Sequence, residues 1–311
     1  MKSLIIILGP TGVGKTDICL NLADLFHTPV IGADSRQMYA DIPVCTAAPT
    51  KEQMERARHY FVGNLKIDDY YSAAKYEEQA SELIDTLFGS HDILLASGGS
   101  MMYIDSLCYG IDDIPTVSPE IRQNLTDRLK AEGLDSLTSE LKLLDPDYYR
   151  QADLRNPKRV LHALEICYMT GHPYSDLRTG NRRERPYNII RIGLNRERGE
   201  LYDRINRRVS SMVENGLLEE AERMYPFKGL NSLNTVGMKE LFSWMDGKPT
   251  PDGRPQTLEF ALDCIRRNSR VYSRKQMTWF KRDPDTVWFH PDDSNSIVEY
   301  INRRIHADKT V

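Results

Sequence analysis

The segment that most constrains this chain is an eight-residue stretch near its start, Gly9-Pro10-Thr11-Gly12-Val13-Gly14-Lys15-Thr16. It follows an apolar run and precedes a helix-like pattern, which is the context that a phosphate-binding loop requires. Glycines let backbone N–H groups turn toward a polyphosphate, and Lys15 supplies a charge and Thr16 a hydroxyl for Mg²⁺. We expect all eight residues to bind a diphosphate or a nucleotide such as ATP, with Thr16 as a metal ligand. The alternative is a glycine-rich turn without a ligand.

Short apolar runs bounded by turn residues predict buried strands at 4–8, 29–31, 93–96, 189–194 and 287–289. Helix-like patterns at 16–26 and 72–88 separate the first three runs. Strand and helix alternate in this way when a parallel sheet is covered by helices. The predicted fold class is therefore α/β, with a P-loop-type parallel sheet core flanked by helices.

The pattern becomes almost purely helical from about residue 118. Ser118-Pro119-Glu120 is typical of a capped helix start, and helical patterns follow at 120–131, 134–144 and 157–170. A polar break at 180–186 precedes the next predicted strand. We therefore predict two domains: residues 1–118 with 187–311 form the α/β catalytic core, which ends in C-terminal helices at 200–215, 217–224, 237–245 and 257–282, and residues 119–186 form an all-helical insertion.

A second candidate functional residue is Asp34, just after the second predicted strand. Nucleotide hydrolases usually carry an apolar strand that ends in an Mg²⁺-binding aspartate, but here the run 93–96 continues into Ser97-Gly98-Gly99-Ser100. No NKxD tetrad for guanine is present either. A carboxylate at the end of a strand in an open α/β sheet points into the ligand crevice. Asp34 could act there as a general base, or it could cap the following helix.

The net charge of −4 argues against a nucleic-acid-binding protein, but the charge is unevenly distributed. Between residues 178 and 208, ten arginines stand against four acidic residues, a net charge of +6. From 264 to 282, seven cationic residues stand against no acidic ones, and Tyr272, Trp279 and Phe280 lie among them. Cations interleaved with aromatic residues suit phosphate contacts and base stacking. We interpret these segments as favouring a nucleic acid over a merely solvated helix face.

The cysteines and the apolar runs indicate in which cellular compartment the protein is expected. The cysteines have no CxxC spacing, and we expect free thiols rather than metal ligands at Cys19, Cys45, Cys108, Cys167 and Cys264. The apolar run 4–8 is too short for a signal peptide or a membrane span, and no later run is long enough. We expect a cytoplasmic protein that does not contact membranes.

Further motifs follow the phosphate-binding loop in a defined order. They are DSRQMY at 34–39, HYFVG at 59–63, YSAAKY at 71–76, SGGSMMY at 97–103, NPKRVLHALE at 156–165, LYDRINRRV at 201–209, TVGMKE at 235–240 and QMTWFKR at 276–282. Together they resemble the tRNA dimethylallyltransferases (tRNA isopentenyltransferases), in the bacterial-type short form, over nearly the whole chain. The resemblance implies transfer of a dimethylallyl group from dimethylallyl diphosphate to N6 of the adenosine 3′-adjacent to the tRNA anticodon, with release of pyrophosphate.

The resemblance also implies roles for individual residues. Asp34 would accept the proton of the adenine amine, Ser100 would line the channel where the family usually has Thr, and Arg208 would hold the leaving pyrophosphate, with Arg204 and Arg207 as alternatives. Lys15 and Thr16, with Mg²⁺, would stabilise the charge on the diphosphate. Contacts with the tRNA anticodon stem-loop are expected from Asp34, Ser35, Arg36, Gln37, Ser100, Arg122, Lys158, Arg159, Val160, Leu161, His162, Lys239, Arg270, Arg274, Lys275 and Gln276.

The sequence departs from the family pattern at two places. Cys45-Thr46-Ala47-Ala48-Pro49 lacks the Gly and Lys of the family's GTAKP, and His162 stands in place of an Arg. We expect both changes to weaken tRNA contacts without touching the reaction centre. The zinc-finger tail of some eukaryotic relatives is absent after Arg282, and we expect a monomer. The competing hypotheses are a small-molecule kinase that uses the loop for ATP, and a tRNA-binding module without catalytic activity.

Overall fold

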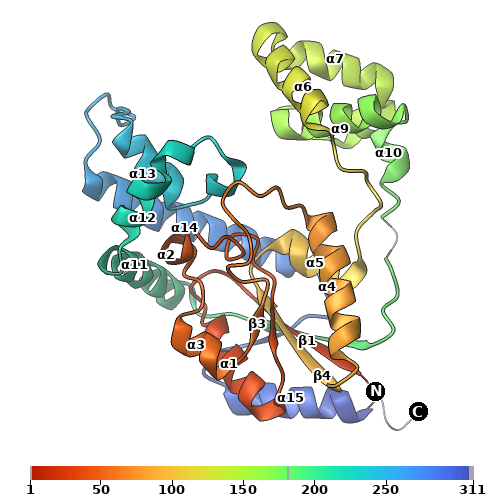
Figure 1. Ribbon diagram of the computed structural model, residues 1–311, viewed down its shortest axis with the longest axis vertical. Helices are drawn as coiled ribbons and strands as arrows, with labels where there is room; N and C mark the ends of the chain where they lie inside the picture. The colour runs from red at the N-terminus through yellow and green to blue at the C-terminus, as the bar shows by residue number, and fades with distance from the viewer. Residues whose placement is uncertain (1, 181, 308–311) are drawn as a thin grey trace. The chain divides into compact units, whose positions relative to one another are not determined.

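The computed structural model describes residues 2–180 and 182–307 of the chain (Figure 1). Within these residues the chain divides into two compact units. One unit spans Met1–Cys108 and Arg185–Val311, and the other spans Tyr109–Glu184. The first carries the phosphate-binding loop, and the second is the helical segment inserted into it.

Within the described residues, the first unit is built on a six-stranded sheet in the order β3-β2-β4-β1-β5-β6. All neighbouring strands are parallel. Parallel strands buried on both faces have nearly continuous apolar sequences, as Leu4 to Leu8 of the central strand does. The α/β prediction is confirmed. The strands are β1 (Ser3–Leu8), β2 (Val30–Gly32), β3 (His59–Tyr60), β4 (Ile93–Gly98), β5 (Asn188–Leu194) and β6 (Val287–Phe289).

Helices surround this sheet. Residues from α1, α11 and α15 share one apolar cluster with alternate residues of β1 and β5, so these helices cover one sheet face. A second cluster joins α2 and α11 to α14 into a helical layer. The bounds are α1 (Lys15–Phe26), α2 (Pro43–Thr46), α3 (Lys51–Arg56), α4 (Ala73–Leu87), α5 (Met101–Tyr109), α11 (Arg198–Glu214), α12 (Leu217–Met224), α13 (Met238–Met245), α14 (Leu258–Phe280) and α15 (Ser294–Ala307), with 3-10 turns η1 (Tyr225–Phe227) and η2 (Asn231–Leu233).

Within the described residues of the second unit, the regular secondary structure is entirely helical. Its own core contains Leu125, Leu141 and Leu164, and the Ser118 hydroxyl accepts a hydrogen bond from the Ile121 N–H at the start of the first helix. The unit begins at 109 and ends at 184, whereas the sequence placed the insertion at 119–186. The difference arises because the connector before the first helix packs Val117 into the helical core. The helices are α6 (Pro119–Glu132), α7 (Leu134–Leu144), α8 (Pro146–Gln151), α9 (Pro157–Thr170) and α10 (Tyr174–Leu177).

The cysteines, all within the described part of the chain, are free thiols, and Cys264 is the least buried of them. Among the described residues, no helix is both long and apolar enough to cross a membrane.

Candidate active site at the phosphate-binding loop

The phosphate-binding loop connects the carboxyl end of β1 to the start of α1. Gly12 and Gly14 have φ angles of 80° and 107°, in the left-handed region that favours glycine. Gly14 is also the N-cap of α1, and no side chain accepts a hydrogen bond from the first turn of that helix. The N-terminal N–H groups of a helix attract anions when they are left uncapped. The glycine conformations and the uncapped first turn of α1 are typical of an anion-binding loop.

Side chains from several elements hold the loop in place. Lys15 Nζ donates to the carbonyl oxygens of Gly9 and Pro10, at 2.9 and 3.0 Å. Arg204 Nε donates to Gly12 O at 3.0 Å, and Arg196 Nε donates to Val13 O at 2.9 Å. These bonds fix the loop carbonyls and thereby the directions of the peptide planes. Sequence reasoning missed Arg196, since it lies outside every motif.

Lys15, Asp34 and Arg208 form an electrostatic cluster beside the loop. Burial lowers the pKa of Lys15 to about 8, the Asp34 carboxylate opposes this shift, and the Arg208 guanidinium adds to it. Burial also lowers the pKa of Arg208, and Asp34 again opposes the shift. Arg208 Nη2 donates to Thr46 O at 3.1 Å. Since Arg204 is committed to Gly12 and Arg207 is exposed, the geometry favours Arg208 among the three candidate arginines.

Asp34 and Ser100 follow the adjacent strands β2 and β4. Asp34 Oδ1 accepts a hydrogen bond from the Arg36 N–H at 3.0 Å, as in the capping alternative. Among the described residues, Asp34 Oδ2 accepts no hydrogen bond, so one oxygen remains available to a substrate. Ser100 Oγ accepts from the Ser35 N–H at 2.8 Å and donates to Ser35 Oγ at 3.1 Å. Ser100 thus holds the segment that carries Asp34.

The rest of the DSRQMY segment contacts neighbouring loops. Arg36 Nη1 donates to Ser232 O at 3.1 Å. Gln37 Nε2 donates to Thr46 O at 3.2 Å and Ala47 O at 3.0 Å, so this amide contacts the 45–49 segment where the sequence departs from the family. Lys239 is exposed on α13. These contacts join the Asp34 segment to the helical layer.

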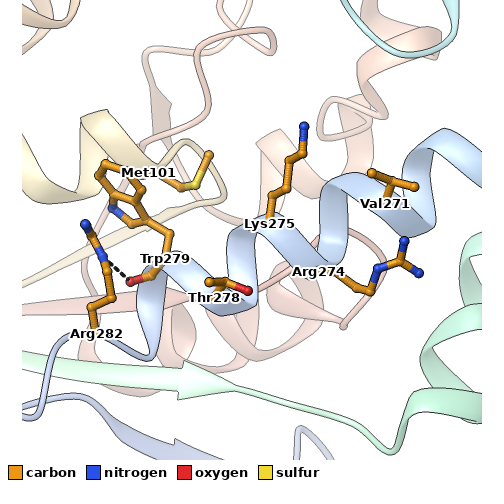
Figure 2. A pocket seen from close by; sticks show the side chains of 7 residues that line it. All are labelled: Met101, Val271, Arg274, Lys275, Thr278, Trp279 and Arg282. Carbon is orange, nitrogen blue, oxygen red and sulfur yellow. Dashed lines mark hydrogen bonds between the residues drawn. The ribbon is translucent and has the colours of Figure 1, made fainter. Parts of the chain in front are cut away.

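Helix α14 presents a face with the cations Arg274, Lys275 and Arg282 beside Met101, the first residue of α5 (Figure 2). Arg270 Nη1 donates to Asn206 Oδ1 at 2.7 Å, and Arg274 Nη1 donates to Tyr202 OH at 3.0 Å. Arg274 and Lys275 are exposed. With Met101 and the rest of this face they line a cavity of about 550 Å³, whose other lining residues are Val271, Thr278, Trp279 and Arg282.

Gln276 is buried, whereas the sequence predicts that it contacts tRNA. Its side chain is 2% exposed. Its Oε1 accepts from the Thr11 N–H at 2.9 Å, and its Nε2 donates to Gly99 O at 2.8 Å. Since both ends of the amide are bonded inside the protein, Gln276 links α14 to the phosphate-binding loop rather than offering a surface contact to tRNA.

In the helical unit, the residues predicted to contact tRNA differ in their exposure to solvent. Lys158 and Arg159 are exposed, and Leu161 is partly buried. The side chain of Val160 is 0% exposed in the core of the unit, which corrects the expectation that it contacts tRNA. Arg122 Nε lies 3.3 Å from Glu165 Oε1, and His162 Nδ1 lies 3.5 Å from Glu165 Oε2. Glu165 therefore contacts both the Arg122 and the His162 side chain.

The basic segment 178–208 is less available to a nucleic acid than its charge suggests. Arg185 pairs with Glu77 at 2.8 Å. Arg191 is buried and pairs with Asp283 at 2.6 Å and with Asp285 at 2.5 Å. These cations are compensated by acids that are distant in the sequence, so a count of charge along the chain overstates the surface charge here.

The fold and this site define a P-loop-type α/β protein in which the Asp34 carboxylate lies near Lys15. Residues 37–283 match the family model described as IPP transferase. The chain is similar to tRNA dimethylallyltransferase 1 of Phocaeicola vulgatus, with 58% identity over 98% of this chain and 99% of that protein. The corresponding protein of Bacteroides thetaiotaomicron is 56% identical over 97% and 96%.

This chain is also similar to a solved structure. The full-length tRNA isopentenylpyrophosphate transferase of Bacillus halodurans superposes with a TM-score of 0.71 and 31% identity, covering 99% of this chain and 98% of that one. The chain belongs to the IPP transferase family.

Proposed function

We propose that the protein is a tRNA dimethylallyltransferase, which transfers a dimethylallyl group from dimethylallyl diphosphate to N6 of the adenosine 3′-adjacent to the tRNA anticodon and releases pyrophosphate. Family membership supports the class of enzyme. The observation that carries the mechanism is the cluster of Lys15, Asp34 and Arg208, which combines cations for a diphosphate with a carboxylate for a nucleophile.

The phosphate-binding loop would hold the diphosphate. The uncapped first turn of α1 and the charge of Lys15 suit its anionic oxygens. The exposed Thr16 at the second position of α1 fits a hydroxyl ligand to Mg²⁺, shared with the diphosphate. A bound Mg²⁺ would stabilise the negative charge that develops on the leaving group. Arg208 would contribute a second cation at the same place.

Asp34 would activate the acceptor amine. The N6 lone pair of adenine is delocalised into the ring, so the amine is a poor nucleophile until its proton is accepted. The N6 atom forms a bond to C1 of the dimethylallyl group, the C1–O bond breaks, and its electron pair leaves with pyrophosphate. Asp34 Oδ2 takes the N6 proton as general base. Ser100 and Ser35, joined to each other, keep this carboxylate segment in place.

The adenosine must leave the anticodon stack to reach the partly buried Asp34. Exposed cations on α14 and α9, including Arg274, Lys275, Lys158 and Arg159, supply phosphate contacts for the anticodon arm. The proposed catalytic residues all belong to one unit of the chain. A monomeric enzyme is part of the proposal. A cytoplasmic location is part of the same proposal.

The test is incubation of the protein with unmodified tRNA, radiolabelled dimethylallyl diphosphate and Mg²⁺, without ATP, followed by digestion to nucleosides. We expect labelled N6-dimethylallyl adenosine, and no label when EDTA is added. ATP turnover without labelled adenosine would instead support the kinase hypothesis. Binding of tRNA without turnover of either compound would support the non-catalytic module.

A further inference from the structure

Arg196 lies between β5 and α11 and is only 8% exposed. Its Nε donates to Val13 O of the phosphate-binding loop at 2.9 Å, although the two residues are 183 positions apart. Water competes for the hydrogen bonds of an exposed arginine. A buried guanidinium that donates to a backbone carbonyl instead fixes the direction of that carbonyl.

A turn near the C-terminus holds the other side of the Arg196 guanidinium. Arg196 Nη2 donates to Asp292 Oδ1 at 2.8 Å, and Arg196 Nη1 pairs with Glu200. His290 Nε2 lies 3.2 Å from Glu200 Oε2, and His290 Nδ1 accepts from the Asp292 N–H at 3.3 Å. The hydrogen bond from Arg196 lowers the pKa of Asp292 and so favours its ionised form. The guanidinium is therefore fixed from both sides.

The same residues could be taken for a metal site. Ligand atoms of Glu200, His290 and Asp292 lie within 4.8 Å of one another. However, Arg196 already pairs with both carboxylates and supplies the positive charge that a metal ion would bring. Asp292 is also exposed to water, and Glu200 is partly exposed. The cluster is better explained as the support of a guanidinium.

The consequence concerns the peptide bond between Val13 and Gly14. In a trans peptide the C=O and the N–H point in opposite directions. When Arg196 holds Val13 O, the Gly14 N–H is directed away from Arg196, and Gly14 is the N-cap of α1. We infer that Arg196, braced by Asp292 and Glu200, is a positioning residue that presents the Gly14 N–H to the diphosphate. This inference rests on the proposed function. The bracing turn lies beyond residues 37–283, the part matched by the family model.

The test compares Arg196→Gln, Asp292→Asn and the control Arg303→Gln, which removes an exposed charge from α15. The measurements are thermal unfolding, the Kd for pyrophosphate with Mg²⁺ by calorimetry, and steady-state kinetics. We expect Arg196→Gln to raise the Kd by about tenfold, because it removes the guanidinium that holds Val13 O. Asp292→Asn should raise it by roughly two- to fivefold, because it replaces a charged acceptor of that guanidinium with a neutral one. KM for dimethylallyl diphosphate should rise more than kcat falls, with KM for tRNA unchanged. Arg303→Gln should match the wild type.

A folded Arg196→Gln protein with the wild-type Kd overturns the inference. If Arg196→Gln does not fold, an unchanged Kd in Asp292→Asn does the same, because Asp292 is exposed and its amide variant keeps the fold. Binding of Zn²⁺ alone that His290→Ala abolishes would assign the cluster to a metal and also overturns it. A wild-type protein that binds no pyrophosphate and labels no tRNA overturns the proposed function, and the positioning role with it.

Discussion

Asp34 stands in the field of two cations, Lys15 and Arg208, and keeps one oxygen without a hydrogen bond from the described residues. We predict that Asp34→Asn lowers kcat by about 10²- to 10⁴-fold, because the amide cannot accept the N6 proton. The affinities for dimethylallyl diphosphate and tRNA should change little. Single-turnover kinetics and filter binding measure the two effects separately. Asp68→Asn, at an exposed acid of the same unit, is the control; equal losses of rate and affinity in Asp34→Asn would remove the base assignment.

Lys15 predicts how diphosphate binding depends on pH. Its pKa is lowered to about 8, first by burial and then by Arg208, so the free protein loses this positive charge as the pH rises through about 8. A terminal phosphate ionises near pH 6, so the ligand charge is constant above neutral pH. The affinity for dimethylallyl diphosphate should therefore be steady below pH 8 and fall above it, by at most about tenfold per pH unit.

Calorimetry between pH 7 and 9 measures this dependence, and Lys15→Arg provides the comparison. Arginine stays charged over the whole range, so the variant should lose the decline above pH 8 even if its affinity is lower throughout. The same decline in both proteins would assign the titration to another group.

For single residues, the sequence predicts the functional side chains that belong to a recognisable motif. It does not predict those whose roles depend on contacts made only in the folded protein. Lys15 and Thr16 are recognisable from spacing, and Asp34 from its place after a strand. Arg196 and Gln276 are not, because their roles depend on contacts with Val13 and Thr11 across more than half of the chain. The sequence predicts Gln276 at the surface because it lies beside Arg274 and Lys275, which are exposed, but the helix turns Gln276 inward.

Among the elements, α7 and α9 have the bounds that the sequence predicts. Asn156 caps the start of α9 and Gly171 follows its end, whereas α7 begins after Gly133 and ends before Asp145 and Pro146. Strand β3 was not predicted, since its two residues, His59 and Tyr60, form no apolar run and the strand exists through pairing with β2. Helix α15 was also missed, although Ile297, Ile301 and Ile305 repeat every four residues on its buried side. That signal was present in the sequence.

Helix α14 couples two loops through Gln276, which leads to a prediction for that element. Gln276→Met keeps the size of the side chain but leaves the Thr11 N–H and Gly99 O without partners, so the free energy of unfolding should fall by about 1–3 kcal/mol. KM for dimethylallyl diphosphate should rise, because Thr11 belongs to the phosphate-binding loop. Urea unfolding and steady-state kinetics are the measurements.

Lys275→Met is the matched comparison, on the next residue of the same helix. Lys275 is exposed, so this variant should weaken tRNA binding and leave unfolding unchanged. If Gln276→Met instead loses only tRNA affinity, at unchanged stability, Gln276 contacts tRNA as the sequence first indicated.

For the whole molecule, the net charge of −4 does not tell where positive charge is exposed on the surface. Several arginines are compensated inside the fold, as Arg191 is by Asp283 and Asp285, and so contribute little to the field outside. Among the cations that remain exposed, Arg274 and Lys275 lie on the helix that reaches the phosphate-binding loop through Gln276. The distribution of charge in space, rather than its total or its order along the chain, therefore decides whether RNA binds.

This distribution predicts the salt dependence of tRNA binding. Each phosphate neutralised by a cation releases counterions, so the slope of log K against log salt concentration falls by about 0.7–0.9 per lost contact. Arg274→Gln should therefore weaken tRNA binding and flatten this slope by about one such contact. Arg266→Gln, on the same helix, should leave the slope unchanged, because Arg266 pairs with Glu259 at 2.9 Å and with Asp263 at 2.7 Å. Filter binding across a salt series distinguishes the two, and equal slopes for both variants would show that exposure of a charge on α14 does not select the residues that contact RNA.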